Sequence, residues 1–139
     1  MRRFRLLLVE DNLADARLLC EALGEAEIDA DLVTVRDGEA ALAMLRSPDY
    51  ARPDAVILDL NLPRMDGREL LAAIRGDAEF SELAVVVLST SHYDRDIRAC
   101  QDLRARAYVI KPAGFEEFIE VARRIARICN EVDEQPLLR

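Results

Sequence analysis

The sequence predicts an α/β fold, in which a five-stranded parallel sheet carries helices on both of its faces. Five apolar runs of strand length recur along the 139 residues and are separated by segments with helical periodicity. Most of these runs are continuous rather than alternating, which is typical of strands buried on both faces. Strands that alternate with helices favour parallel pairing, because each helix returns the chain across a face of the sheet.

The expected strands are short and aliphatic, and each is followed by polar or helix-forming residues. They cover Arg5–Val9, Asp31–Val35, Ala55–Leu58, Leu83–Ser89 and Ala107–Ile110. Their lengths match ordinary buried strands.

The expected helices follow the strands and place apolar residues three or four positions apart. The first is predicted to stop at Gly24, and the second ends before Pro48. Their apolar faces are, in chain order, Ala16, Leu19, Cys20 and Leu23; Ala40, Ala41, Met44 and Leu45; Leu70, Leu71 and Ile74; Ile97, Cys100 and Gln101 or Leu103; and Phe115, Phe118, Ile119, Ala122, Ile125, Ala126 and Cys129.

Composition and charge exclude several classes of function. The chain is 51% hydrophobic, which excludes disorder, and no apolar run is long enough to cross a bilayer. A net charge of −8 argues against nucleic acid and membrane surfaces as partners. Three cysteines and one histidine form neither a disulfide framework nor a His-rich metal site. We therefore expect a reduced, cytoplasmic protein.

We expect one domain, residues 1–130, followed by a tail over residues 131–139. The length fits a single domain of ordinary size. No linker and no further element follow the fifth helix, so no output domain is expected.

Residues with useful chemistry follow four of the five strands. Because ligands of open α/β sheets bind beyond the carboxyl ends of the strands, we expect one shared site. Three carboxylates suit a hard cation such as Mg²⁺, and a carboxylate nucleophile beside a metal, a hydroxyl and a lysine favours phosphoryl transfer. A single Asp after a strand is most often a helix cap, so the prediction depends on the whole set. The set is Glu10, Asp11, Asp59, Asn61, Ser89, Thr90, Ser91 and Lys111.

At these residues the sequence resembles the receiver domain of two-component response regulators, from about Arg5 to Ile128. The resemblance implies a flavodoxin-like fold with strand order 2-1-3-4-5 and five helices. The motifs that carry it are Leu8–Asn12, Ile57–Gly67, Val87–Thr90 and Tyr108–Pro112.

The resemblance also implies a role for each site residue. Asp59 is the phospho-acceptor, and Lys111 contacts the phosphoryl group and then Asp59. The bond between Lys111 and Pro112 is expected to be cis. Mg²⁺ is bound by the carboxylates of Asp11 and Asp59, by the backbone carbonyl of Asn61, and by Glu10 directly or through water.

Two further residues are implied as the switch. Ser89 is the expected switch hydroxyl, and Tyr108 is the aromatic residue that follows it inward. Thr90 then occupies a position that usually holds Ala or Gly, and Thr90 itself is the alternative switch hydroxyl.

A finer resemblance is to the small stand-alone regulators paired with phytochrome-type sensor kinases. It is carried by Leu60–Pro63, Gly67–Leu71, Leu88–Ser91 and the long connection Ser47–Pro53. It implies a sensor histidine kinase as phosphoryl donor and output through the surface of the fourth helix, fifth strand and fifth helix. The first helix, with Asp15, Arg17 and Leu18, is expected to meet the kinase.

The fifth helix carries a second apolar stripe beside the first. An apolar arc this wide predicts either a broad contact with the core or the interface of a homodimer, which is the oligomer we expect. The stripe consists of Val121, Ile125, Ile128 and Val132.

Three other functions fit parts of the pattern. A phosphatase of the haloacid dehalogenase type needs a second acid two positions after its nucleophile, where this chain has Asn61. An unphosphorylated pseudo-receiver has no need of the retained site residues. A phosphate sink needs the same site as a signalling regulator. We therefore expect a regulator rather than an enzyme.

Overall fold

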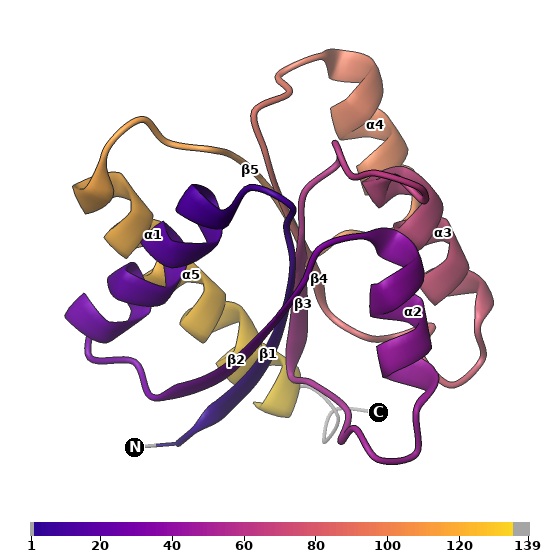
Figure 1. Cartoon of the computed structure of the whole chain (residues 1–139), viewed down its shortest axis with the longest axis horizontal. Coiled ribbons are helices and arrows are strands. Elements are labelled where there is room, and N and C mark those ends of the chain that lie inside the picture. The colour runs from indigo at the N-terminus through magenta and orange to yellow at the C-terminus, as the bar shows by residue number, and fades with distance from the viewer. Residues whose placement is uncertain (1, 135–139) are drawn as a thin grey trace.

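The computed structural model describes residues 2–134, and side chains as far as Glu131. Strands and helices alternate strictly along the chain, as the hydrophobic pattern predicts (Figure 1). The elements are β1 (Phe4–Val9), α1 (Leu13–Glu25), β2 (Ala30–Val35), α2 (Gly38–Arg46), β3 (Ala55–Leu58), α3 (Gly67–Gly76), β4 (Val85–Ser89), α4 (Asp94–Asp102), β5 (Ala107–Ile110) and α5 (Phe115–Glu134).

The five strands form one parallel sheet in the order β2-β1-β3-β4-β5, which confirms the predicted flavodoxin-like topology. The register pairs Val9 with Leu58, the last residues of β1 and β3. It also pairs Ser89 with Ile110, the last residues of β4 and β5. The residues that follow these four strands therefore meet at one edge of the sheet.

Helices cover both faces of the sheet. Figure 1 shows α1 and α5 on one side and α2, α3 and α4 on the other. Successive residues of a strand face opposite layers, so Leu6 and Leu8 pack toward α1 and α5 while Leu7 and Val9 pack toward α2 and α3. Burial of each such side chain contributes about 1.5–3 kcal/mol. This two-sided burial explains why the strands are continuously apolar.

The fifth helix faces the sheet with a wider arc than the core stripe that the sequence analysis expected. Val121, Ile125 and Ile128 are buried in the core, at 7%, 1% and 6% exposure, so the homodimer interface predicted for them is wrong. The side chain of Val132 lies outside the described residues. Phe115, which was expected in the core stripe, is 37% exposed. The wide apolar arc is thus a broad core contact.

The ends of two helices differ from the expected positions. Helix α1 continues past Gly24 to Glu25, and the left-handed backbone conformation that follows it is taken by Glu27 (φ 58°). Helix α5 continues past Glu131, where the tail was expected to begin, to Glu134; residues 135–139 lie outside the described residues.

Across the described part of the chain, none of the helices combines the length and the apolar composition needed to cross a bilayer.

Candidate functional site

Three carboxylates meet where β1 and β3 end. Oxygen atoms of Glu10, Asp11 and Asp59 lie within 4.8 Å of one another. The backbone places them there, since the Asp59 N–H donates to the Val9 carbonyl at 3.1 Å. Glu10 and Asp59 are buried, whereas Asp11 is exposed. Oxygen ligands of this kind, partly open to solvent, fit Mg²⁺.

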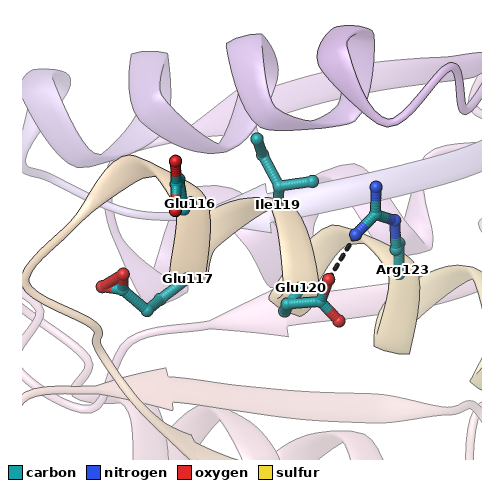
Figure 2. A pocket seen from close by; sticks show the side chains of 5 residues that line it. All are labelled: Glu116, Glu117, Ile119, Glu120 and Arg123. Carbon is teal, nitrogen blue, oxygen red and sulfur yellow. Dashed lines mark hydrogen bonds and ion pairs between the residues drawn. The ribbon is translucent and has the colours of Figure 1, made fainter.

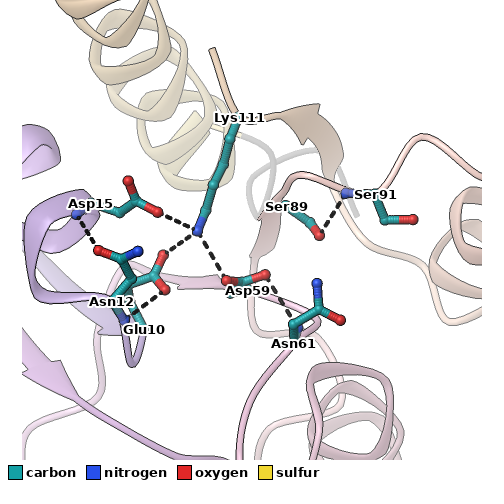
Figure 3. Close-up of polar contacts among 8 residues, drawn as sticks. All are labelled: Glu10, Asn12, Asp15, Asp59, Asn61, Ser89, Ser91 and Lys111. Carbon is teal, nitrogen blue, oxygen red and sulfur yellow. Dashed lines mark hydrogen bonds and ion pairs between the residues drawn. The ribbon is translucent and has the colours of Figure 1, made fainter. Parts of the chain in front are cut away.

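One ammonium group, that of Lys111, offsets part of the negative charge of this cluster. The side chain of Lys111 is 7% exposed, and its Nζ lies 2.8 Å from Glu10 Oε1, 2.7 Å from Asp15 Oδ2 and 3.0 Å from Asp59 Oδ2 (Figure 3). An ammonium has three N–H donors, so each carboxylate receives one. Burial lowers the pKa of Lys111, but the hydrogen bonds to the three carboxylates outweigh it and raise the pKa above its ordinary value. Lys111 therefore stays charged.

The site remains short of positive charge. Burial raises the pKa of Glu10 to about 7, and the nearby charge of Asp59 adds to this, while Lys111 opposes it. A buried carboxylate with a raised pKa is one whose negative charge is poorly compensated. A divalent cation would supply the missing charge, and the three oxygen donors suit it.

Asn61 joins the edge through its backbone. Its N–H donates to Asp59 Oδ1 at 3.2 Å, which brings the loop after β3 against the carboxylate. Its side chain is exposed. The predicted use of its backbone carbonyl as a metal ligand stays a prediction.

The hydroxyl groups at the end of β4 lie in unlike surroundings. Ser89 is completely buried, and its Oγ accepts from the Ser91 N–H at 3.2 Å (Figure 3), whereas Thr90 is exposed. The Lys111 N–H donates to the Ser89 carbonyl at 2.8 Å, which fixes β4 beside β5 at this point. The burial favours Ser89 over Thr90 as the switch hydroxyl.

Tyr108 is half-buried and connects to the same loop. Its hydroxyl donates to the Ser91 carbonyl at 2.8 Å. Burial raises the pKa of Tyr108, and hydrogen bonds with Ser91 and Ser89 lower it in part. The aromatic residue predicted as part of the switch thus contacts the loop that follows the predicted switch hydroxyl.

A network of hydrogen-bonded side chains that the sequence analysis missed extends from this loop. Ser91 Oγ donates to Asp96 Oδ2 at 2.5 Å, and Arg68 pairs with Asp96 Oδ1 at 2.8 Å. Asp96 is only 8% exposed although it is charged. This side-chain network links the start of α3 to the start of α4. No periodicity or motif signals it, because its members come from three separate segments.

The sequence analysis also missed the contact that Asp15 makes within the site. The sequence analysis placed it on the surface that meets the kinase, whereas its carboxylate contacts Lys111, 96 residues away. Its side chain is 26% exposed, and its predicted contact with the kinase stays a prediction. The signal that could have found it is its place in the first turn of the helix that follows Asp11.

Two smaller expectations are wrong. The Lys111–Pro112 bond is trans rather than cis. Cys20, expected to face the core with the apolar side of α1, is exposed, whereas Cys100 and Cys129 are buried.

An open pocket at the start of α5 lies apart from this site. Its lining is formed by Glu116, Glu117, Ile119, Glu120 and Arg123, and Arg123 pairs with Glu120 along the helix (Figure 2). It shares no residue with the carboxylate cluster.

Known proteins resemble this chain over nearly its whole length. The family model for the response regulator receiver domain matches residues 6–123. Response regulator Rcp1 from Synechocystis sp. is 40% identical over 135 residues, which cover 94% of this chain and 92% of Rcp1. The crystal structure of the phosphorylated cyanobacterial phytochrome response regulator RcpA has a TM-score of 0.81 and 43% identity, covering 89% of this chain and 91% of RcpA. The Mn²⁺-bound form of Rcp1 has a TM-score of 0.80 and 39% identity, covering 88% and 91%.

Proposed function

The chain belongs to the response regulator receiver domain family, and on this basis we propose that it accepts a phosphoryl group on Asp59 from a phytochrome-type sensor histidine kinase. The observation that carries the proposal is the buried Lys111 ammonium, which lies 3.0 Å from Asp59 Oδ2 inside a cluster of carboxylates. An acceptor carboxylate beside a fixed cation at an open sheet edge is the arrangement that phosphoryl transfer requires.

Transfer begins at the Asp59 carboxylate. One oxygen attacks the phosphorus of a phosphohistidine, the new O–P bond forms, and the P–N bond breaks as the imidazole leaves. The Lys111 ammonium holds a phosphoryl oxygen in place of one of its carboxylate contacts. Glu10, Asp11 and Asp59, with the Asn61 carbonyl, would hold a divalent cation, which when bound would supply positive charge beside the transferred group.

The phosphorylated site differs from the resting one in charge and in acceptor oxygens. We assign Ser89 as the hydroxyl that donates to the phosphoryl group, and we propose that its turn toward that group moves its Oγ away from the Ser91 N–H. The Tyr108–Ser91 contact then loosens, since both hydrogen bonds hold the same loop. The surface formed by α4, β5 and α5 changes as a result, and a protein effector that prefers one of its states reads the signal.

We also propose that residues 1–130 act as the receiver domain of a cytoplasmic regulator rather than of an enzyme. A phosphate sink, which needs the same site, is the alternative. A phosphatase reaction lacks its acid at Asn61, whose amide cannot donate a proton as a carboxylic acid does.

The test is the intact mass of the full chain after incubation with acetyl phosphate and Mg²⁺. We expect one added phosphoryl group in the natural sequence and in Asp102→Asn, an exposed control carboxylate on α4, and none in Asp59→Asn. Transfer from a phosphorylated phytochrome-type kinase, compared with an unrelated kinase, tests the donor. Size-exclusion elution before and after phosphorylation reports the oligomeric state.

A missing adduct has two causes that a second measurement separates. Binding of beryllofluoride, a mimic of the phosphoryl group, together with no adduct indicates rapid hydrolysis and supports the proposal. Neither an adduct nor beryllofluoride binding indicates a pseudo-receiver and overturns it.

A further inference from the structure

The first turn of α1 uses its polar groups in an unusual way. Asn12 is the N-cap, and its Oδ1 accepts from the Asp15 N–H at 3.1 Å. Asp15 therefore holds the third helical position, from which an acidic side chain commonly reaches back to the N–H of the cap residue. Here Glu10 Oε2 accepts that Asn12 N–H instead, at 3.2 Å (Figure 3).

This exchange leaves the Asp15 carboxylate available for another partner. Its Oδ2 lies 2.7 Å from Lys111 Nζ, the shortest of the three contacts of that ammonium. Asp15 does not belong to the group of carboxylates whose oxygens gather for a metal ion. Lys111 thus has two partners inside the metal cluster and one outside it.

We propose that Asp15 is a positioning residue, which keeps the Lys111 ammonium at the site when a divalent cation occupies its other two carboxylate partners. The inference rests on the proposed function, because it concerns the metal site of that function.

The ammonium of Lys111 and a divalent cation compete for the same two carboxylates. Glu10 and Asp59 are shared between the Lys111 ammonium and the metal site, so a bound divalent ion weakens both contacts and repels the ammonium. A buried ammonium that loses its partners is costly, because burial disfavours its charge. Asp15 keeps one short contact and so lowers the cost of binding the metal.

The first consequence is a coupling between Asp15 and metal affinity. Asp15→Asn should weaken Mg²⁺ binding by about tenfold, the usual range for a residue that positions a neighbour of a metal site. Asp15→Glu, which keeps the charge, should restore the affinity to within about threefold. Glu69→Gln is the matched control, because it removes the same charge from the same helical position of α3 and should leave affinity unchanged.

The second consequence separates positioning from simple charge attraction. In a Lys111→Met background, Asp15→Asn should change the Mg²⁺ dissociation constant by less than about twofold, since no ammonium is left to hold. A through-space attraction between Asp15 and the metal would persist in that background or grow, because Lys111 would no longer neutralise Asp15.

The experiment is isothermal titration calorimetry of Mg²⁺ into the full chain for these variants, with circular dichroism to confirm that each is folded. A tenfold loss in the natural background that disappears with Lys111→Met supports the inference. No loss, or an equal loss in both backgrounds, overturns it while leaving the proposed function intact. Failure of the natural sequence to bind Mg²⁺ in the millimolar range would instead overturn the metal site of the proposed function.

Discussion

Helices α1 and α3 begin beside the same site and are attached to it by different means. Each follows a strand that carries a site carboxylate, and each has a polar N-cap and an acid three positions later. In α3 the acid closes a capping box, because the Asp66 N–H donates to Glu69 Oε1 at 3.5 Å. In α1 the corresponding acid, Asp15, reaches across to Lys111.

The contact between α3 and the residues that follow β3 is steric. A Cβ added to Gly67 would lie 2.2 Å from the Asp59 carbonyl oxygen and 2.7 Å from the Leu60 Cα. Backbone contacts of this kind do not depend on the charge of the site. The start of α1 contacts the site through the ion pair of Asp15 and Lys111. The strength of this ion pair depends on the other charges bound at the site. The difference teaches that α3 is held beside Asp59 by close backbone packing, whereas the start of α1 is joined to the site by a charged contact.

The largest effect is expected from breaking the steric contact. Gly67→Ala forces a methyl group into backbone atoms of Asp59 and Leu60, which should lower the free energy of unfolding by about 1–3 kcal/mol or more and displace the acceptor. Gly76→Ala in the same helix is the control, because nothing lies within 4 Å of its added Cβ. Urea unfolding measures both. Equal stability of the two variants would show that the contact yields without cost.

A second prediction concerns Cys100 on α4, which is buried in the same core cluster as the apolar face of α3. Burial raises the pKa of the Cys100 thiol to about 11, with Asp96 adding to the shift. The unfolded chain ionises this thiol near its ordinary pKa of about 8.5, so the folded state loses stability as pH rises from about 9 to 11, by about 1.4 kcal/mol per pH unit. Below pH 8 this group should have no effect on pH dependence.

The Cys100→Ala variant checks the pH prediction. Its free energy of unfolding, followed by urea denaturation between pH 8 and pH 10, should fall less steeply than that of the natural sequence. Parallel pH profiles would contradict the prediction.

The two helix caps should differ modestly. Asp66 accepts from the N–H groups of Arg68 and Glu69, whereas Asn12 accepts from that of Asp15 alone. Asp66→Ala should therefore cost about 1–2 kcal/mol and Asn12→Ala about 0.5–1 kcal/mol. Urea unfolding of both variants without Mg²⁺ gives the comparison, and the reverse order would show that the site, rather than the cap, holds the start of α1.

The smallest effect is expected from neutralising the acid of the capping box. Glu69→Gln keeps an oxygen that can accept the Asp66 N–H, so stability should change by less than about 0.5 kcal/mol. Thermal unfolding measures the change in stability. A larger loss would mean that the charge of Glu69, and not only its hydrogen bond, stabilises α3.

The sequence predicted the sheet well and one helix face poorly, for a physical reason. Strands buried on both faces are continuously apolar, so β3 was found at its observed bounds. The buried arc of α5 includes Val121 and Ile128, which adjoin the stripe that was expected to face the core. Two adjoining apolar stripes have the same periodicity, and only packing against the sheet decides whether one or both are buried.

The candidate site, like the fold, was predicted only in part. The carboxylates and Lys111 were found because each follows a strand, and the topology brings strand ends together. The parts played by Asp15 and Asp96 depend on which way a side chain turns among several polar neighbours. Motif spacing does not contain that information, since the partners of Asp15 and Asp96 lie 96 and 28 residues away.

The order of the strands has a consequence for how the protein is made. Strand β1 lies inside the sheet between β2 and β3, while Lys111 follows β5, the last strand to be synthesised. A growing chain thus carries Glu10, Asp15 and Asp59 well before the cation that neutralises them emerges. Because a domain generally folds as a unit, the pocket cannot be completed until β5 and Lys111 have left the ribosome. The acidic groups of the pocket are therefore synthesised first and its lysine last.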